Sequence, residues 1–347
     1  MTKKLWGIAV LLLIGMLVLA GCGSKTEPST EKTLKKFNVG YLPTPGHVLY
    51  FVAKEKGYFQ EAGLNVEMFQ FTNSGEGLNA LKSGKIDVGA FGTAAPLTFI
   101  SKGAEFTIFG GQQSEGAGIV TRPEKAGQFK ELNNFKGKSV ATVRLATGDV
   151  VFRGALQQAG IDWKKDLTIK ELDSPAAVLE AVKKGSVDAG VVWAPYMKMA
   201  EKQGLKIVKY SGELINDHTC CRQAALTSKL KENPDDYKRF SKALIKAYDF
   251  YQNNKTESVD IISNYVKIDK DIIDAETYGG HMSSNPDPNR EGIVKFWEMM
   301  NKVGYISSDK NITDYINTDL YAQALDELLK ENPNNQIYQK LKAEFKP

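Results

Sequence analysis

The chain has 347 residues, and its 45 Lys and Arg residues nearly balance its 41 Asp and Glu residues, for a formal net charge of +4. That balance argues against a nucleic-acid partner, because such partners are usually bound by a concentrated basic face. The length exceeds what one simple core accommodates and predicts two lobes of ordinary size. Its three cysteines form no disulfide framework, so stability must come from buried apolar cores.

The amino-terminal residues have the pattern of an export signal. Two lysines precede an unbroken apolar stretch, residues 5–20, which is too short for a comfortable membrane span. The ending Leu19-Ala20-Gly21-Cys22 resembles a bacterial lipobox, in which the cysteine receives lipid. We therefore expect a lipoprotein signal peptide at residues 1–21, lipidation of Cys22, and a domain on the extracytoplasmic face of the cell membrane. An uncleaved anchor and an ordinary signal peptide are the alternatives.

Residues 22–36 are small and polar, which predicts a flexible tether. Beyond them, strand-like and helix-like patterns alternate along the chain. The predicted strands are residues 37–42, 65–71 and 88–91, and the predicted helices between them are residues 48–56 and a segment ending at Lys82. This order is typical of an open parallel α/β sheet.

A similar pattern recurs about a hundred residues later. Residues 81–90 and 182–191 each place a glycine-capped helix end, an aspartate and an apolar strand before an Ala-Pro pair. We expect the two aspartates, Asp87 and Asp188, to be structural turn or cap residues. Two such units predict two lobes with a crevice between them. Ligands bind in such sheets outside the carboxyl ends of the strands, where helix amino termini converge.

The lobes are expected to exchange chain. Residues 121–222 have strand and helix patterns of their own and predict the second lobe, while residues 37–120 and 223–347 form the first. The crossings are expected in the apolar stretches 117–122 and 222–227. From residue 234 onward the sequence is strongly helical, and these helices are expected to support the first lobe.

Several short motifs resemble one family of transport proteins. They are Gly40-Tyr41, residues 53–59 (AKEKGYF), Gly63-Leu64, residues 83–89 (SGKIDVG) and residues 192–196 (VWAPY). Together they resemble the nitrate/sulfonate/taurine type of ABC-transporter substrate-binding protein, a group that also includes binders of thiamine pyrimidine precursors. The resemblance implies an α/β periplasmic-binding-protein type II fold with two lobes, each a mixed sheet flanked by helices. It also implies that the closed, loaded form docks on a membrane permease. We further expect a monomer that is no enzyme and needs no cofactor.

Candidate ligand contacts in the first lobe lie where predicted strands meet helices. Thr44, Gly46 and His47 follow the first strand, and their free amides and hydroxyl are suited to an anion. Simple helix capping is the alternative for this group. Gly92 and Thr93 follow the strand of the repeated motif, where small residues let the backbone approach a ligand closely.

The second lobe offers an arginine and two aromatic residues. Arg144 precedes Thr147 and Gly148 at a strand-to-helix junction, and its planar fork suits a sulfonate, carboxylate or phosphate. A surface arginine beside a capping threonine is the alternative. Trp193 and Tyr196 are expected to form an aromatic wall, although either is also a candidate for the core.

The segment before the expected return crossing is the most unusual. It holds His218, the adjacent cysteines Cys220 and Cys221, and Arg222. We expect His218 and Arg222 to contact the ligand or the hinge. Adjacent cysteines form only a strained disulfide, whereas free thiols pack as small apolar groups. The three histidines and Cys220 fit no compact metal motif, so no metal site is expected.

The expected function is capture of a small anionic organic solute and its delivery to an ABC importer. A thiamine pyrimidine precursor is the alternative ligand, but the Cys-rich motif of those binders has a longer run of cysteines than this chain. A metal-dependent or pyrimidine-synthase-like enzyme is a further alternative. The chain has neither a phosphate-binding loop with a Lys-Ser/Thr ending nor a Gly-x-Ser-x-Gly nucleophile elbow.

Overall fold

The computed structural model describes residues 34–347. The expected signal peptide, Cys22 and nearly all of the expected tether lie outside the described residues. The strand β1 begins at Lys35 and pairs there with Leu64, so ordered structure starts earlier than the expected residue 37. None of the helices in residues 34–347 combines the length and apolar character needed to cross a membrane.

The first sheet has six strands in the order β11-β4-β10-β3-β1-β2. Its strands are β1 (Lys35–Tyr41), β2 (Leu64–Gln70), β3 (Val88–Gly92), β4 (Phe106–Glu115), β10 (Thr219–Leu226) and β11 (Met282–Ser283). The strands β1, β2 and β3 are parallel, whereas β10 runs antiparallel to both of its neighbours. The predicted parallel α/β unit is confirmed, and the returning chain adds an antiparallel strand to it.

The second sheet repeats this plan with five strands in the order β7-β6-β8-β5-β9. Its strands are β5 (Ala117–Thr121), β6 (Ser139–Val143), β7 (Thr168–Leu172), β8 (Ala189–Trp193) and β9 (Lys206–Tyr210). The strands β6, β7 and β8 are parallel, and β5 is antiparallel to β8 and β9. The fold is therefore α/β, with two mixed sheets.

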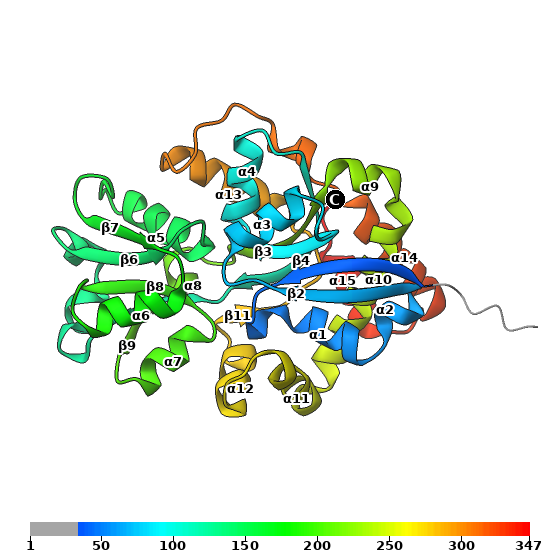
Figure 1. Cartoon of the computed structure of the whole chain (residues 1–347), viewed down its shortest axis with the longest axis horizontal. Helices are drawn as coiled ribbons and strands as arrows, with labels where there is room; N and C mark the ends of the chain where they lie inside the picture. The colour runs from blue at the N-terminus through cyan, green and yellow to red at the C-terminus, as the bar shows by residue number, and fades with distance from the viewer. Residues whose placement is uncertain (1–33) are drawn as a thin grey trace, which may run out of the picture. The chain divides into compact units, whose positions relative to one another are not determined.

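Helices cover both faces of the first sheet. They are η1 (Pro45–His47), α1 (Val48–Glu55), α2 (Tyr58–Glu61), α3 (Ser74–Lys82), α4 (Ala94–Ser101), α9 (Thr227–Glu232), α10 (Pro234–Asn253), α11 (Lys255–Tyr265), α12 (Lys270–Tyr278), α13 (Arg290–Lys302), η5 (Ile312–Tyr315), α14 (Asp319–Glu331) and α15 (Gln336–Glu344). One apolar core joins the sheet to α1, α10 and α14, and a second joins it to α3, α4 and α13. Figure 1 shows α3, α4 and α13 on one side of this sheet and α1 on the other.

The second sheet is flanked by fewer helices. They are η2 (Pro123–Lys125), η3 (Gln128–Lys130), η4 (Leu132–Phe135), α5 (Thr147–Gln158), α6 (Pro175–Lys183), α7 (Tyr196–Lys202) and α8 (Ser211–Leu214). Its two cores hold α6 and α7 in one and α5 in the other. Val150 and Val151 of α5 belong to a core of the first lobe instead, so α5 packs against both lobes.

The chain crosses between the sheets at other residues than expected. The first crossing is at Gly116, between β4 and β5, and the second is the segment 215–218 before β10. The stretches 117–122 and 222–227 are apolar because they largely form the strands β5 and β10, which pair along their whole lengths. Positive φ angles at Glu115 (58°), Gly116 (85°) and Asp217 (54°) turn the chain at these crossings. The lobe boundaries thus fall before residue 120 and before residue 222.

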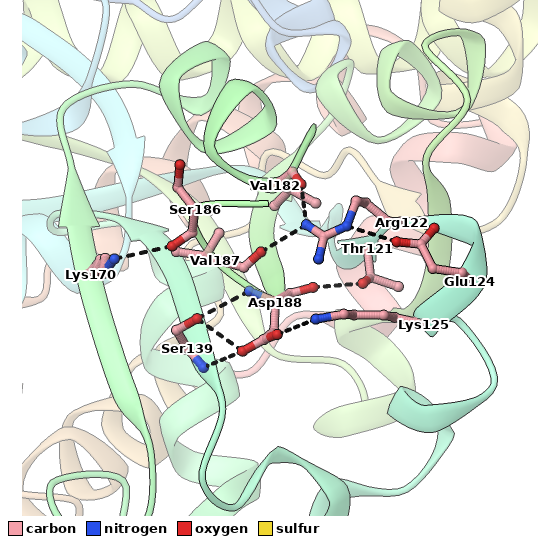
Figure 2. Close-up of polar contacts among 10 residues, drawn as sticks. All are labelled: Thr121, Arg122, Glu124, Lys125, Ser139, Lys170, Val182, Ser186, Val187 and Asp188. Atoms are coloured by element: carbon pink, nitrogen blue, oxygen red, sulfur yellow. Dashed lines mark hydrogen bonds and ion pairs between the residues drawn. The ribbon is translucent and has the colours of Figure 1, made fainter. Parts of the chain in front are cut away.

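The two aspartates of the repeated motif occupy matching places. Asp87 accepts the backbone N–H of Asn38 on β1, and Asp188 accepts the backbone N–H of Ser139 on β6. Figure 2 shows that Asp188 also accepts hydrogen bonds from the Ser139 hydroxyl and from Lys125. Despite partial burial, these donors lower the pKa of Asp188 to about 2. Both aspartates fasten the amino ends of neighbouring strands, while Gly92 and Trp193 at the opposite ends of β3 and β8 border the cavity described next.

Candidate functional site between the two lobes

A small cavity lies where the two lobes meet, and we call it the interlobe cavity. It encloses about 30 Å³, room for one or two water molecules. Its lining residues are Leu42, Thr44, Ser74, Gly92, Gln113, Cys220 and Cys221 from the first lobe and Ala117, Ala146, Thr147, Gly148 and Trp193 from the second. None of these side chains is charged, and six of them are aliphatic, aromatic or thiol groups.

Helix amino termini supply the polar character of the interlobe cavity. Ser74 is the first residue of α3, Thr147 is the first residue of α5, and Gly92 lies two residues before the first residue of α4. The unpaired N–H groups and the helix dipole make such termini favourable for a negative charge. The cavity therefore offers positive potential from backbone groups where it has no cationic side chain.

The hydroxyl of Thr147 bridges the lobes between two of these termini. It accepts the N–H of Ala94 at 3.4 Å and lies 3.4 Å from the carbonyl oxygen of Cys220. Both distances are long for hydrogen bonds, so the hydroxyl only loosely fills the space between α4 and α5. An oxygen atom of a ligand would find the same donor there.

The residues after β1 take different roles from one another. The Thr44 hydroxyl donates to the carbonyl of Ala194 at 2.7 Å, which is a direct contact between the lobes. Gly46 does not line the cavity. A Cβ at this position would lie 1.8 Å from the Gln113 side chain, so the glycine allows close packing against Gln113. His47 is fully buried, and its Nδ1 accepts the Leu42 N–H at 3.2 Å. Burial lowers the pKa of His47 to about 3, so the ring is neutral.

Gly92 borders the interlobe cavity, whereas the neighbouring Thr93 does not. The Thr93 hydroxyl donates to the carbonyl of Cys220 at 2.5 Å and holds the start of α4 against β10. Trp193 lines the cavity, and Tyr196 packs edge-on behind it with ring centroids 6.2 Å apart. Trp193 is thus the aromatic wall, and Tyr196 supports it.

Arg144 points away from the interlobe cavity. Its side chain is 63% exposed, and its Nε lies 3.6 Å from a carboxylate oxygen of Glu171 on the adjacent strand β7. The next residue, Leu145, has a φ of 63°, so the chain turns sharply between Arg144 and the cavity-lining Thr147 and Gly148. The structure therefore separates this arginine from the other candidates of its loop.

Arg222 is buried but lies outside the interlobe cavity. Its Nη1 donates to the carbonyls of Gln113 and Cys221 at 2.7 and 2.8 Å. It borders a polar pocket of about 310 Å³ that also includes Asp217 and Asp287. Burial lowers the pKa of Arg222 to about 10, so the guanidinium stays charged at neutral pH.

His218 is buried at the second crossing, and neither ring nitrogen has a hydrogen-bond partner within residues 34–347. Burial lowers its pKa to about 4, which leaves the ring neutral. Throughout the described part of the chain, no group of three or more His, Cys, Asp or Glu side chains has a metal-binding arrangement. The three histidines and Cys220 therefore do not gather into one cluster.

Sequence reasoning did not select several residues that line the cavity, notably Ser74, Gln113 and the two cysteines. Ser74 had a signal, because it begins a predicted helix after a strand. The adjacent cysteines had a signal in their rarity. Gln113 had none, since it lies in the polar carboxyl-terminal half of β4, and its place becomes evident only when the strand order is known.

A buried carboxylate forms another contact between the lobes. Glu276 on α12 accepts the backbone N–H of Lys198 on α7 at 3.1 Å and is 4% exposed. Burial raises its pKa from 4.5 to about 7, while the Lys198 N–H and charge oppose the rise and Glu201 adds to it. On the opposite side of the interface, the Trp163 indole N–H donates to the carbonyl of Val303 at 3.0 Å.

The substitution Glu276→Gln is expected to change how stability depends on pH. Because the folded pKa is raised, the contribution of Glu276 is fully present below about pH 4.5 and is lost as pH rises through about 7. Glutamine keeps an acceptor for the Lys198 N–H without a charge. The variant should therefore melt a few degrees above the unmodified protein at pH 8 and at nearly the same temperature at pH 5. Differential scanning calorimetry at both pH values tests this.

The control is Glu201→Gln, which removes a more exposed carboxylate from α7. Within residues 34–347 this carboxylate forms an ion pair with Lys198 alone. It should lack the stabilisation at pH 8. Parallel pH profiles for Glu276→Gln and the unmodified protein would contradict the assignment.

Comparison of the sequence with known protein families identifies the family of this chain. The model of the NMT1-like family matches residues 30–263, which is more than half of the chain. The chain belongs to the NMT1-like family. Its fold is the periplasmic-binding-protein type II fold, as expected from the sequence.

Two curated relatives and one solved structure are similar to this NMT1-like protein. A putative aliphatic sulfonates-binding protein of Bacillus subtilis (strain 168) is 28% identical over 275 residues, covering 77% of this chain and 80% of the relative. A 4-amino-5-hydroxymethyl-2-methylpyrimidine phosphate synthase of Saccharomyces cerevisiae is 27% identical and covers 71% of this chain and 72% of its own. The solved periplasmic nitrate-binding protein of Synechocystis PCC 6803 has a TM-score of 0.73 at 18% identity, covering 85% and 89% of the two chains.

Proposed function

We propose that this NMT1-like protein is the extracytoplasmic solute-binding component of an ABC importer. In this role it captures a small anionic organic solute between its lobes and delivers it to a membrane permease. The proposal includes attachment to the membrane through lipid on Cys22. The Bacillus relative, a putative aliphatic sulfonates-binding protein, supports the sulfonate class.

One observation carries the proposal, namely that the interlobe cavity is lined by residues from both lobes. A ligand in this place contacts both lobes at once only in the closed form. It therefore binds the closed form more tightly than the open form and shifts the balance toward closure. The chain crosses between the lobes at Gly116 and at residues 215–218, where a small change of backbone angles opens or closes them.

The chemistry of the lining supports a ligand with two unlike ends. One end carries an oxyanion that meets the amino termini of α3, α4 and α5, since no charged side chain lines the cavity. The other end is a small apolar group that contacts Trp193 and Leu42. A sulfonate with a short carbon chain has both parts, whereas nitrate leaves the apolar wall without a partner. Such a solute is larger than the one or two water molecules for which the cavity has room, so the lobes move apart at the crossings to admit it and close on it less tightly than in this structure. In this proposal the helix amino termini bind the anion. Arg144 does not, because its side chain points away from the cavity toward Glu171.

A thermal-shift panel tests the proposal on a chain beginning at Thr33. The panel holds alkanesulfonates, taurine, nitrate, carboxylates and thiamine pyrimidine precursors, because a ligand that binds only the folded state raises the melting temperature by mass action. We expect the shift to be largest for an alkanesulfonate. A shift with a pyrimidine alone would replace the sulfonate class with the heteroaromatic alternative. No shift with any member would contradict the proposed function.

The substitution Trp193→Ala is expected to weaken binding of the solute found in the panel. It removes the aromatic wall of the cavity, so the loss should be about tenfold or more. Trp193 is partly buried at the edge of a core of the second lobe, so the melting temperature of the variant is measured alongside. Calorimetric titration measures the change in Kd. The control is Tyr196→Phe, which keeps the ring behind Trp193 and should bind as the unmodified protein does. Equal affinity of Trp193→Ala and the control would show that the ligand does not reach this wall.

A further inference from the structure

Two thiols stand side by side at the interlobe cavity. Cys220 and Cys221 are both free and buried, and their Sγ atoms are 3.9 Å apart. Successive side chains of a regular strand point to opposite faces, so adjacent residues do not normally share one cavity. Here β10 departs from regular pairing with β4 around Cys221, and both cysteines line the cavity.

The two thiols differ in how readily they ionise, and the nearest fixed positive charge is that of Arg222. The guanidinium of Arg222 is 2% exposed, its Nε has no hydrogen-bond partner, and no carboxylate within residues 34–347 lies at ion-pair distance from it. The amino terminus of α5 faces the same space through Thr147. The hydrogen bond with Cys221 lowers the pKa of Cys220 against the effect of burial, and the charge of Arg222 acts in the lowering direction. The same hydrogen bond and burial raise the pKa of Cys221, so this thiol is protonated in the free protein and loses its proton only when a metal ion displaces it.

The donor set restricts which ion can bind. Within the described residues, the two thiols have no third His, Cys, Asp or Glu to complete a cluster. Zinc sites use three or four protein ligands, and calcium and magnesium require oxygen ligands. Soft thiolate donors select copper(I) among the ions available to proteins, and monovalent soft ions accept two ligands.

We propose that Cys220 and Cys221 bind one soft monovalent cation of the copper(I) class as a two-thiolate complex at the interlobe cavity. On binding, two S–H bonds break, two metal–sulfur bonds form and two protons leave to solvent, with no change of oxidation state. The product carries one negative charge, which Arg222 and the amino terminus of α5 stabilise. The ion occupies the cavity, so it competes with the solute for the same space.

Silver(I) is the probe, because it has the coordination preference of copper(I) without its redox chemistry. The reduced full chain carries Cys22→Ser, which leaves only Cys220 and Cys221 as thiols. Calorimetric titration is expected to show one silver ion per chain, and a pH-stat should record two protons released per ion. Zinc added in place of silver should give no stoichiometric uptake.

Serine variants locate the site. Cys220→Ser and Cys221→Ser should each lose stoichiometric uptake of silver while keeping the circular dichroism spectrum of the parent. If either variant fails to fold, protection of the parent thiols from iodoacetamide by silver gives the same information without a substitution. Stoichiometric uptake by the double serine variant, or alkylation that silver does not slow, would overturn the proposal. Absence of solute binding in the thermal-shift panel would leave this result unaffected, because the titration contains no solute.

Discussion

The substitution Arg153→Met is expected to lower the free energy of unfolding by about 3–5 kcal/mol, because it leaves a buried carboxylate without its counter-charge. Arg153 donates two hydrogen bonds to Asp149, both at 2.9 Å, and a third to Glu171 at 2.9 Å. Asp149 is fully buried and Arg153 is 3% exposed, so water cannot replace the lost partner. The guanidinium also lies 4.1 Å from the centre of the Trp163 ring.

The pH dependence of this loss follows from Asp149. Burial raises its pKa from 3.8 to about 6 even though Arg153 opposes the rise. Without Arg153 the pKa rises further, and protonation then removes the unpaired charge. The loss of stability should therefore be largest above neutral pH and shrink as pH falls.

Urea denaturation at pH 7.5 and pH 5.5 measures both effects. The matched control is the double variant Asp149→Asn/Arg153→Met, which removes both charges and should regain most of the lost stability. A decrease of less than about 1 kcal/mol in the single variant at pH 7.5 would show that Asp149 is not held as a buried ion.

The substitution Gly92→Val is expected to weaken solute binding by tenfold to a hundredfold, in the range of about 1–3 kcal/mol that overpacking costs. A Cβ at Gly92 would lie 2.9 Å from the Thr147 hydroxyl oxygen and 3.5 Å from the Thr147 nitrogen. Thr147 belongs to the second lobe and Gly92 to the first, so the added methyl groups oppose closure. The backbone angles of Gly92 are open to other residues, because it has no positive φ.

The matched control is Gly127→Val in the second lobe. A Cβ there would meet nothing within 4 Å, and Gly127 has a φ of −62°. This variant should bind with unchanged affinity. If Gly92→Val bound equally well with an unchanged melting temperature, the lobes would not need to approach each other at this point.

The sequence predicted the repeated α/β units well because they are local. The strand after residue 37, the helix ending at Lys82 and the strand at Val88 alternate with the periods of their structures, and the structure confirms them within one or two residues. The helical region expected from residue 234 onward begins with α10, which starts at Pro234. The separate bounds of α11 and α12 within that region were not predicted, because only residues 266–269 separate the two helices.

The exchange of strands between lobes could not be located from sequence. An apolar stretch such as 117–121 has the same composition whether it pairs in the first sheet or the second, so only the pairing places it. The residues that line the cavity could not all be identified from the sequence for the same reason. Arg144 has the right chemistry for an anion, but one left-handed residue, Leu145, turns it toward Glu171. Gln113 and the pair Cys220-Cys221 reach the cavity through the pairing of β4 with β10, which residue patterns do not specify.

Calorimetric titration of one solute into three proteins tests whether the two lobes close around a ligand in the interlobe cavity. The solute is the member of the sulfonate panel with the largest thermal shift, and the proteins are the unmodified chain, Gly92→Val and Gly127→Val. We expect one solute to bind per chain, with weakened binding in Gly92→Val and unchanged binding in Gly127→Val. Equal affinities in all three proteins would contradict closure of the two lobes around a ligand in the interlobe cavity.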